Sequence, residues 1–317
     1  MRVDAVSRRR SAPLAIALRI ATLAGATLSG ATLAIPPLAI ATLAIATPTA
    51  AQDLSIDLRS RGTQPGDAVV VTITTPTDVT ALSVTAFATQ WPVYKIDDTT
   101  WRALLGIDLD RKPGPYVVSV AASSARALTA RRPFTVEPKP FPRRVLKVSP
   151  DYVNPPPAQL ARIERDSAFM RSIYAHSANE PEWRAGFTRP VADPANSSFG
   201  TRSVFNGEPR SPHAGTDFLS PAGTPIHAPA AGRVVGARDL FFTGNTVVID
   251  HGLGAYSMLA HLSHIDVREG QHIAQGDIVG LVGATGRVTG AHLHWALRVG
   301  TARVDPLSVL ALFDTAK

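Results

Sequence analysis

The chain has 317 residues, of which 45% are hydrophobic and none is cysteine. This length and composition allow about two domains with a folded core, and the lack of cysteine excludes a disulfide framework and a thiolate zinc site. The formal net charge is +7, and five arginines and one aspartate in the first 51 residues contribute +4 of it, so the remainder is too weakly basic to indicate a nucleic-acid partner.

Residues 1–51 are predicted to be an export signal. A basic head, Arg8-Arg9-Arg10, precedes a long stretch rich in Ala, Leu, Ile and Thr. The small residues Thr49-Ala50-Ala51 are typical of a signal-peptidase site. Pro36 and Pro37 interrupt the apolar stretch and argue against one straight membrane helix, so an uncleaved membrane anchor is the alternative interpretation.

Residues 52–137 are predicted to form an all-β domain. Apolar and polar residues alternate over 54–58, and runs rich in β-branched residues follow at 69–75 and 82–87. Turn signals such as Pro65-Gly66-Asp67 separate these runs. We expect a small β-sandwich, immunoglobulin-like in character, and the sequence leaves open whether it spaces, docks or covers the rest of the chain.

Residues 138–185 are predicted to be a Pro-rich connector followed by a short helix. The connector carries a basic patch that includes Arg143 and Arg144, and the prolines at 155–157 can open a helix. Beyond them, apolar residues fall close to one face at helical spacing, which predicts a packing helix between the domains. These apolar residues are Leu160, Ile163, Met170, Ile173 and Tyr174.

Residues 186–312 are predicted to carry the chemistry of the protein. Eight of the nine histidines lie between His213 and His294. Apolar and polar residues alternate over 291–299, which predicts a strand with His292 and His294 on the same face. Asp217 follows His213 by four residues, so a strand end or loop can aim both side chains at one point. Imidazole and carboxylate ligands suit zinc, and a catalytic zinc takes three protein ligands and a water molecule.

Several motifs occur in one order along this region and together resemble the lysostaphin-like (LytM-type) zinc metallopeptidases over roughly residues 186–310. They are Phe199-Gly200, His213-Ala-Gly-Thr-Asp217, Gly223-Thr224-Pro225, residues 228–232, Ala260-His261-Leu262-Ser263 and residues 283–294. The resemblance implies an antiparallel β-sheet with the site in a groove, and cleavage of peptide bonds in peptidoglycan cross-links or stem peptides. The upstream β domain and connector look similar to the N-terminal part of some bacterial envelope members.

The resemblance also implies a division of roles. His213, Asp217 and His294 match the metal ligands and would hold one zinc ion (Zn2+) per chain, while His261 and His292 match the two catalytic histidines. One of these two histidines would act as the general base and the other would stabilise the oxyanion, and the sequence does not say which. The partners implied are peptidoglycan peptides, with no nucleic acid, and with a membrane only if residues 1–51 stay uncleaved. The location implied is the periplasm or cell envelope, with secretion as the alternative, and oligomeric state has no signal in the sequence.

Two other functions remain open. A catalytically inactive relative could bind and activate another cell-wall hydrolase, but such relatives typically lose ligands or catalytic histidines, and all five residues are present here. A peptidase acting on secreted proteins is the third interpretation. One position departs from the family pattern, because Leu259 stands where many members have tyrosine, and Tyr256 lies three residues earlier. The histidines that match no family ligand are expected to have ordinary hydrogen-bonding roles; they are His227, His251, His264 and His272.

Overall fold

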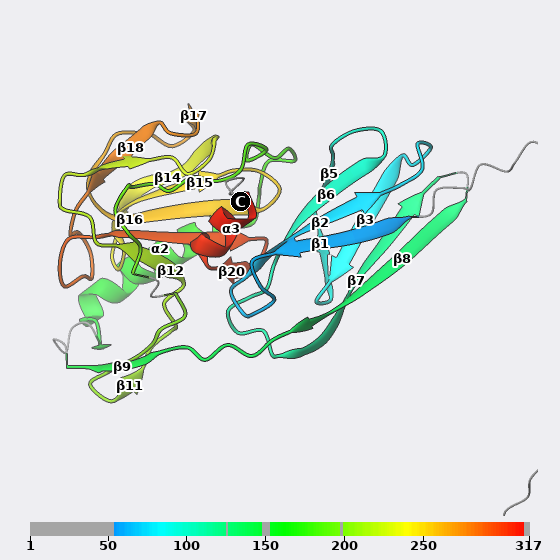
Figure 1. Cartoon of the computed structure of the whole chain (residues 1–317). Helices are drawn as coiled ribbons and strands as arrows, with labels where there is room; N and C mark the ends of the chain where they lie inside the picture. The colour runs from blue at the N-terminus through cyan, green and yellow to red at the C-terminus, as the bar shows by residue number, and fades with distance from the viewer. Residues whose placement is uncertain (1–53, 125, 148–152, 197–198, 314–317) are drawn as a thin grey trace, which may run out of the picture. The chain divides into compact units, whose positions relative to one another are not determined.

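The computed structural model of the protein describes residues 54–124, 126–147, 153–196 and 199–313. The described chain is mostly β-strand, as the sequence predicts, with two helices (Figure 1). The predicted export signal, residues 1–51, lies outside the described residues. Among the residues that are described, no helix has the length and apolar character needed to cross a membrane.

The N-terminal part of the described chain is a β-sandwich of two antiparallel four-stranded sheets, which confirms the expected sandwich. Val71 and Ile73 of one sheet and Val84, Val118 and Val120 of the other are buried together in the core between them. The first sheet has the order β1 (Ser55–Ser60), β2 (Ala68–Thr74), β6 (Thr100–Gly106), β5 (Val93–Lys95), and the second has the order β4 (Thr89–Trp91), β3 (Ala81–Ala86), β7 (Gly114–Ser123), β8 (Ala127–Val136).

The connector contains helix α2 (Pro157–Ile173), which begins at the last proline of the predicted run, with Pro156 as its N-cap. Its last turn packs on the C-terminal sheet, where Ile173 is buried against Val248 and Tyr256. Leu160 was expected on the packed face, but its side chain is 54% exposed, so this part of the prediction is wrong. The apolar contacts of the helix lie in its C-terminal half, where Phe169 and Met170 pack against the same cluster, while its N-terminal half pairs Arg162 with Asp239 at 2.6 Å.

The connector also contributes a strand, which the sequence did not predict. Strand β9 (Arg143–Leu146) pairs in parallel with β10 (Arg202–Phe205), and β10 pairs with β11 (Glu208–Pro209). This three-stranded sheet brings a connector segment beside residues almost sixty positions further along the chain. Figure 1 shows β9 and β11 together, next to the C-terminal sheet.

The C-terminal part is built on a nine-stranded sheet with antiparallel pairing throughout. Large apolar side chains such as Phe218, Leu259 and Trp295 are fully buried against it. The sheet contains β12 (Gly215–Phe218), β13 (Pro225–His227), β14 (Gly232–Leu240), β15 (Gly244–Asp250), β16 (Ala255–Ile265), β17 (His272–Ile273), β18 (Ile278–Val282), β19 (Leu293–Val299) and β20 (Ala302–Val304), and α3 (Pro306–Phe313) follows it.

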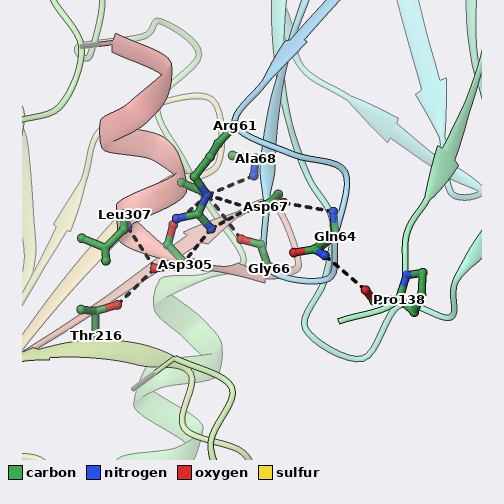
Figure 2. A network of polar contacts seen from close by, with 10 residues as sticks. Arg61, Gln64, Gly66, Asp67, Ala68, Pro138, Thr216, Asp305 and Leu307 are labelled. Atoms are coloured by element: carbon green, nitrogen blue, oxygen red, sulfur yellow. Dashed lines mark hydrogen bonds and ion pairs between the residues drawn. The ribbon is translucent and has the colours of Figure 1, made fainter. Parts of the chain in front are cut away.

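A polar network joins the sandwich to the start of α3 (Figure 2). The Arg61 guanidinium donates to Asp67 Oδ1 at 2.7 Å and to Asp305 Oδ2 at 3.0 Å. Asp305 is also the N-cap of α3, because its Oδ1 accepts from the backbone N–H of Leu307 at 3.0 Å. The same Oδ1 accepts from Thr216 Oγ1 at 3.2 Å, so the network reaches strand β12.

Apolar contacts and a second ion pair extend this junction. Gly106 of the sandwich lies directly against Ala302 and Val304 of β20, and one continuous hydrophobic core includes residues of both parts. Arg303 donates to both carboxylate oxygens of Asp108, from Nη2 at 2.7 Å and from Nε at 3.1 Å. The sandwich is therefore docked on the C-terminal part, and residues 50–317 group as one compact unit.

Candidate metal centre

Three of the predicted site residues converge on one point. Asp217 of β12 and His294 of β19 are directly opposite each other in the sheet. His213 lies just before β12, and backbone hydrogen bonds to Gly200 and Thr201 hold it there. His294 Nδ1 is 2.9 Å from Asp217 Oδ1, while His213 Nε2 is 3.1 Å from Asp217 Oδ1 and 2.9 Å from His294 Nδ1.

This triangle of atoms fits a tetrahedral metal ion. Ligands bound to zinc at about 2.0–2.1 Å in tetrahedral geometry lie roughly 3.3 Å from one another. The three observed separations, 2.9 to 3.1 Å, are close to that value. Two imidazole nitrogens and one carboxylate oxygen also form a donor set that suits zinc. His213, Asp217 and His294 therefore form a group that could hold a metal ion.

The protonation states of the group also suit metal binding. Burial raises the pKa of Asp217, but hydrogen bonds and charge interactions with His213 and His294 outweigh burial and hold that pKa well below its usual range. Burial lowers the pKa of His294, and its hydrogen bond to Asp217 opposes this only in part. An ionised carboxylate and a neutral imidazole are the forms of Asp217 and His294 that can bind a metal.

Gly215 allows β12 to approach the ring of His294. A Cβ atom at this position would lie 2.5 Å from His294 Cε1, 2.7 Å from His294 Nε2 and 2.7 Å from the carbonyl oxygen of Trp295. These separations are shorter than van der Waals contact, and the carbonyl belongs to the backbone of the paired strand. Close packing at the metal group therefore requires glycine at the position between His213 and Asp217.

His261 is placed by an irregularity in β16. The pairing of β16 with β15 shifts between residues 259 and 262, and His261 has a φ of 69°, which a residue other than glycine seldom adopts. Its Nδ1 lies 2.9 Å from the carbonyl oxygen of Thr285. A carbonyl oxygen can only accept, so Nδ1 carries the proton and Nε2 has the lone pair. Burial lowers the pKa of His261 to about 4, so the neutral form dominates at neutral pH.

His292 lies one residue before β19, where an isolated bridge pairs it with Gly283. Its Nδ1 is 2.9 Å from the carbonyl oxygen of Gly290, so Nδ1 again carries the proton and Nε2 has the lone pair. The rings of His261 and His292 are 4.9 Å apart, and His292 Nε2 is 3.9 Å from Asp217 Oδ1. His292 therefore lies beside the group of His213, Asp217 and His294 without joining it.

All five predicted site residues line a single cavity of about 300 Å³. The same cavity is lined by Arg144 of β9, Arg210 and Arg287, which the sequence interpretation did not assign to the site. The basic patch at Arg143-Arg144 was the available signal for one of them, but only the pairing of β9 with β10 brings it to the cavity. A larger cavity of about 750 Å³ lies at the docked sandwich, away from these histidines.

The remaining histidines of the region bond to protein groups outside the cavity. His227 contacts the Gly276 carbonyl, His251 is buried between the Ala231 carbonyl and Ser257 Oγ, His264 faces Asp266, and His272 faces Glu182. Tyr256 is buried as well, and its hydroxyl donates to the His176 carbonyl at 2.7 Å. Tyr256 therefore does not replace the tyrosine that is missing at Leu259.

Sequence comparisons show which known proteins this chain is similar to. The profile described as Peptidase family M23 matches residues 211–306. Over 88 residues, the chain is 49% identical to the peptidoglycan DD-endopeptidase ShyA of Vibrio cholerae serotype O1, which is 28% of this chain and 20% of that protein. Over 97 residues, it is 40% identical to the DD-carboxypeptidase/endopeptidase Mpg of Neisseria meningitidis serogroup B, which is 31% of this chain and 22% of that protein. The matched region thus spans about a fifth of these curated relatives.

A solved structure is similar over much more of the chain. The crystal structure of a peptidase M23 protein from Pseudomonas aeruginosa is 34% identical in sequence, with a TM-score of 0.60. The similarity covers 80% of this chain and 96% of the Pseudomonas chain, so it includes more than the region matched by the family profile.

Proposed function

Since this chain belongs to peptidase family M23, we propose that it is an exported, zinc-dependent endopeptidase that hydrolyses peptide bonds in peptidoglycan stem peptides or cross-links. The observation that carries the proposal is the convergence of His213, Asp217 and His294, with His261 and His292 beside them in one cavity. An inactive regulator of another hydrolase would not need all five side chains in this arrangement.

In this proposal His213, Asp217 and His294 hold one zinc ion. When bound, zinc makes hydroxide available near neutral pH and polarises a peptide carbonyl. Asp217 contributes the negative charge, and the two imidazoles bind through nitrogens that already face the carboxylate. Close packing of β12 on β19 keeps the ligands in place, because Asp217 and His294 are paired residues of neighbouring strands.

His261 and His292 would handle the protons. Each donates from Nδ1 to a backbone carbonyl, so each ring has a defined orientation and a lone pair on Nε2. One Nε2 would accept the proton of the attacking water molecule and later pass it to the leaving amine. The other histidine would take a proton from solvent at Nε2 and donate it in a hydrogen bond to the developing oxyanion. The low pKa of His261 before metal is bound favours the neutral, proton-accepting form.

The substrate and the location come from similarity. ShyA is a peptidoglycan DD-endopeptidase and Mpg a DD-carboxypeptidase/endopeptidase, and the family profile that matches this chain covers the residues of the metal group. Peptidoglycan peptides are therefore the proposed substrate, and the cell envelope is the proposed site of action. The N-terminal signal features of residues 1–51 support export to that compartment.

The test is digestion of purified peptidoglycan by the purified protein, with released muropeptides identified by mass spectrometry and casein as a parallel protein substrate. We expect new peptide-cleaved muropeptides, no release after treatment with a chelator, and recovery when zinc is added back. The matched variant His261→Ala should retain zinc and release little. Binding to peptidoglycan without cleavage, together with stimulation of a second hydrolase, would support the inactive-regulator function and refute this one.

A further inference from the structure

The cavity at the metal group is cationic. Three arginines line it, Arg144, Arg210 and Arg287, and the only acidic residue among its described lining residues is Asp217. Three guanidinium groups against one carboxylate leave the described lining with a net positive charge. A concave surface with one sign of charge attracts ligands of the opposite sign.

Two of the arginines belong to the β9–β10–β11 sheet. Arg144 projects from β9, and its Nε donates to Ser203 Oγ of β10 at 2.9 Å, which directs the guanidinium along this sheet. Arg210 directly follows β11, and its Nε is buried without a hydrogen-bond partner among the described residues. Its ion pair with Glu208 at 2.8 Å involves a half-exposed carboxylate, and exposed ion pairs are weak, so a substrate carboxylate can compete with Glu208.

The third arginine comes from the loop that leads to His292. The guanidinium carbon of Arg287 is 4.5 Å from the ring centre of Phe242 and 5.9 Å from that of Phe205. The backbone N–H of Arg287 donates to the Phe242 carbonyl at 2.9 Å, which fixes the base of the side chain. Stacking on aromatic rings orders a guanidinium, so the positive charge of Arg287 has a defined place in the cavity wall.

We propose that Arg144, Arg210 and Arg287 bind free carboxylates of the substrate peptide beside the scissile bond, and so make this protein selective for acidic peptides over their amidated forms. The planar fork of an arginine matches a carboxylate with two parallel hydrogen bonds. The inference rests on the proposed function and adds a substrate preference to it. Strand β9 of the connector then contributes to substrate recognition, because it supplies Arg144.

The experiment compares one substrate in two forms. Cross-linked muropeptides are used either untreated or with their free carboxyl groups converted to primary amides by a carbodiimide and ammonium chloride. The ratio of kcat/KM for the two forms is measured for the wild-type protein, for Arg144→Gln, Arg210→Gln and Arg287→Gln, and for the control Arg268→Gln. Arg268 is exposed in the turn after β16 and does not line the cavity.

We expect the wild type to prefer the untreated form, and each cavity variant to reduce the ratio by roughly 10-fold, the size of a charged hydrogen bond. Arg268→Gln should keep the wild-type ratio. Zinc content and melting temperature are measured for every variant, and where a glutamine variant fails to fold, the lysine variant, which keeps the charge and loses the fork, should reduce the ratio by a smaller factor.

The outcomes separate the two proposals. Equal cleavage of both forms by the wild type would overturn the carboxylate preference and leave the peptidase function intact. A wild-type preference that persists in all three cavity variants would show that other groups recognise the carboxylates. That result would also overturn the proposed role of the three arginines. Failure of the wild type to cleave either form would overturn the proposed function itself.

Discussion

Replacing Gly215 with alanine should disturb the metal group without removing any ligand. The added Cβ would lie 2.5 Å from His294 Cε1 and 2.7 Å from the Trp295 carbonyl oxygen. Ordinary carbon–carbon contacts are about 3.5–4.0 Å, so the ring of His294 has to recede by roughly 1 Å. His294 and Trp295 are both buried, and neither can move without displacing packed neighbours or separating β12 from β19.

The size of the effect follows from this displacement. A movement of roughly 1 Å is a third of the 2.9 Å that joins His294 Nδ1 to Asp217 Oδ1, so the three ligand atoms no longer fit one ion. Loss of ligand orientation typically weakens metal binding by about 10–100-fold. We expect Gly215→Ala to reduce zinc affinity by that factor and activity with it, although all three ligands are still present.

The assay is competition for zinc with a chelator of known affinity, measured on wild type, Gly215→Ala and the control Gly290→Ala. A Cβ at Gly290 would meet no atom within 4 Å, and its backbone needs no left-handed conformation. The control should therefore keep the wild-type zinc affinity and melting temperature. Wild-type zinc affinity in a folded Gly215→Ala protein would refute the close-packing argument.

Three further predictions test other parts of the structure. His294→Ala should lose zinc and activity together, whereas His292→Ala should keep zinc and lose about 10²–10⁴ in rate; equal loss of zinc in elemental analysis would make His292 a ligand. Arg61→Ala removes an ion-pair partner from two buried carboxylates, Asp67 and Asp305, and should lower the free energy of urea unfolding by roughly 2–4 kcal/mol. The loss is smaller than for a fully buried pair because Arg61 is partly exposed. The control Arg59→Ala, at an exposed residue, should change this free energy by no more than about 0.5 kcal/mol. Burial lowers the pKa of His251 from 6.5 to about 4, so the unfolded chain binds more protons between these values and stability falls as pH drops through this window. Between pH 7 and pH 4 the wild type should therefore lose about 3 kcal/mol more than His251→Gln, and identical losses would contradict this.

The docked sandwich shows which structural features local sequence patterns can predict and which they cannot. Alternation over 54–58 and β-branched runs at 69–75 and 82–87 predicted its strands, because strand geometry has a period of two residues and branched side chains pack well on a sheet. Its position could not be predicted, because Arg61 meets Asp305 across 244 positions of the chain. The sequence alone would also suggest that residues 180–317 fold and bind metal by themselves. The shared core and the Asp305 network indicate that this fragment would expose apolar surface and lose support for β12, the strand of Asp217.

The candidate metal-binding residues could be picked out from the sequence because they lie in short motifs that resemble those of a known family. His213 and Asp217 lie four residues apart, and His292 and His294 lie two apart, so backbone geometry restricts where each pair can point. The tertiary structure decided which strands are neighbours, and hence that Asp217 faces His294. It also decided the left-handed backbone that turns His261 into the cavity, and the parallel pairing that brings Arg144 there from the connector. Residue types and local periodicity thus determined the class of fold and the chemistry available. The shape and charge of the site were determined by strand register, strand irregularities and contacts over long sequence separations, because these depend on the packing of the whole chain.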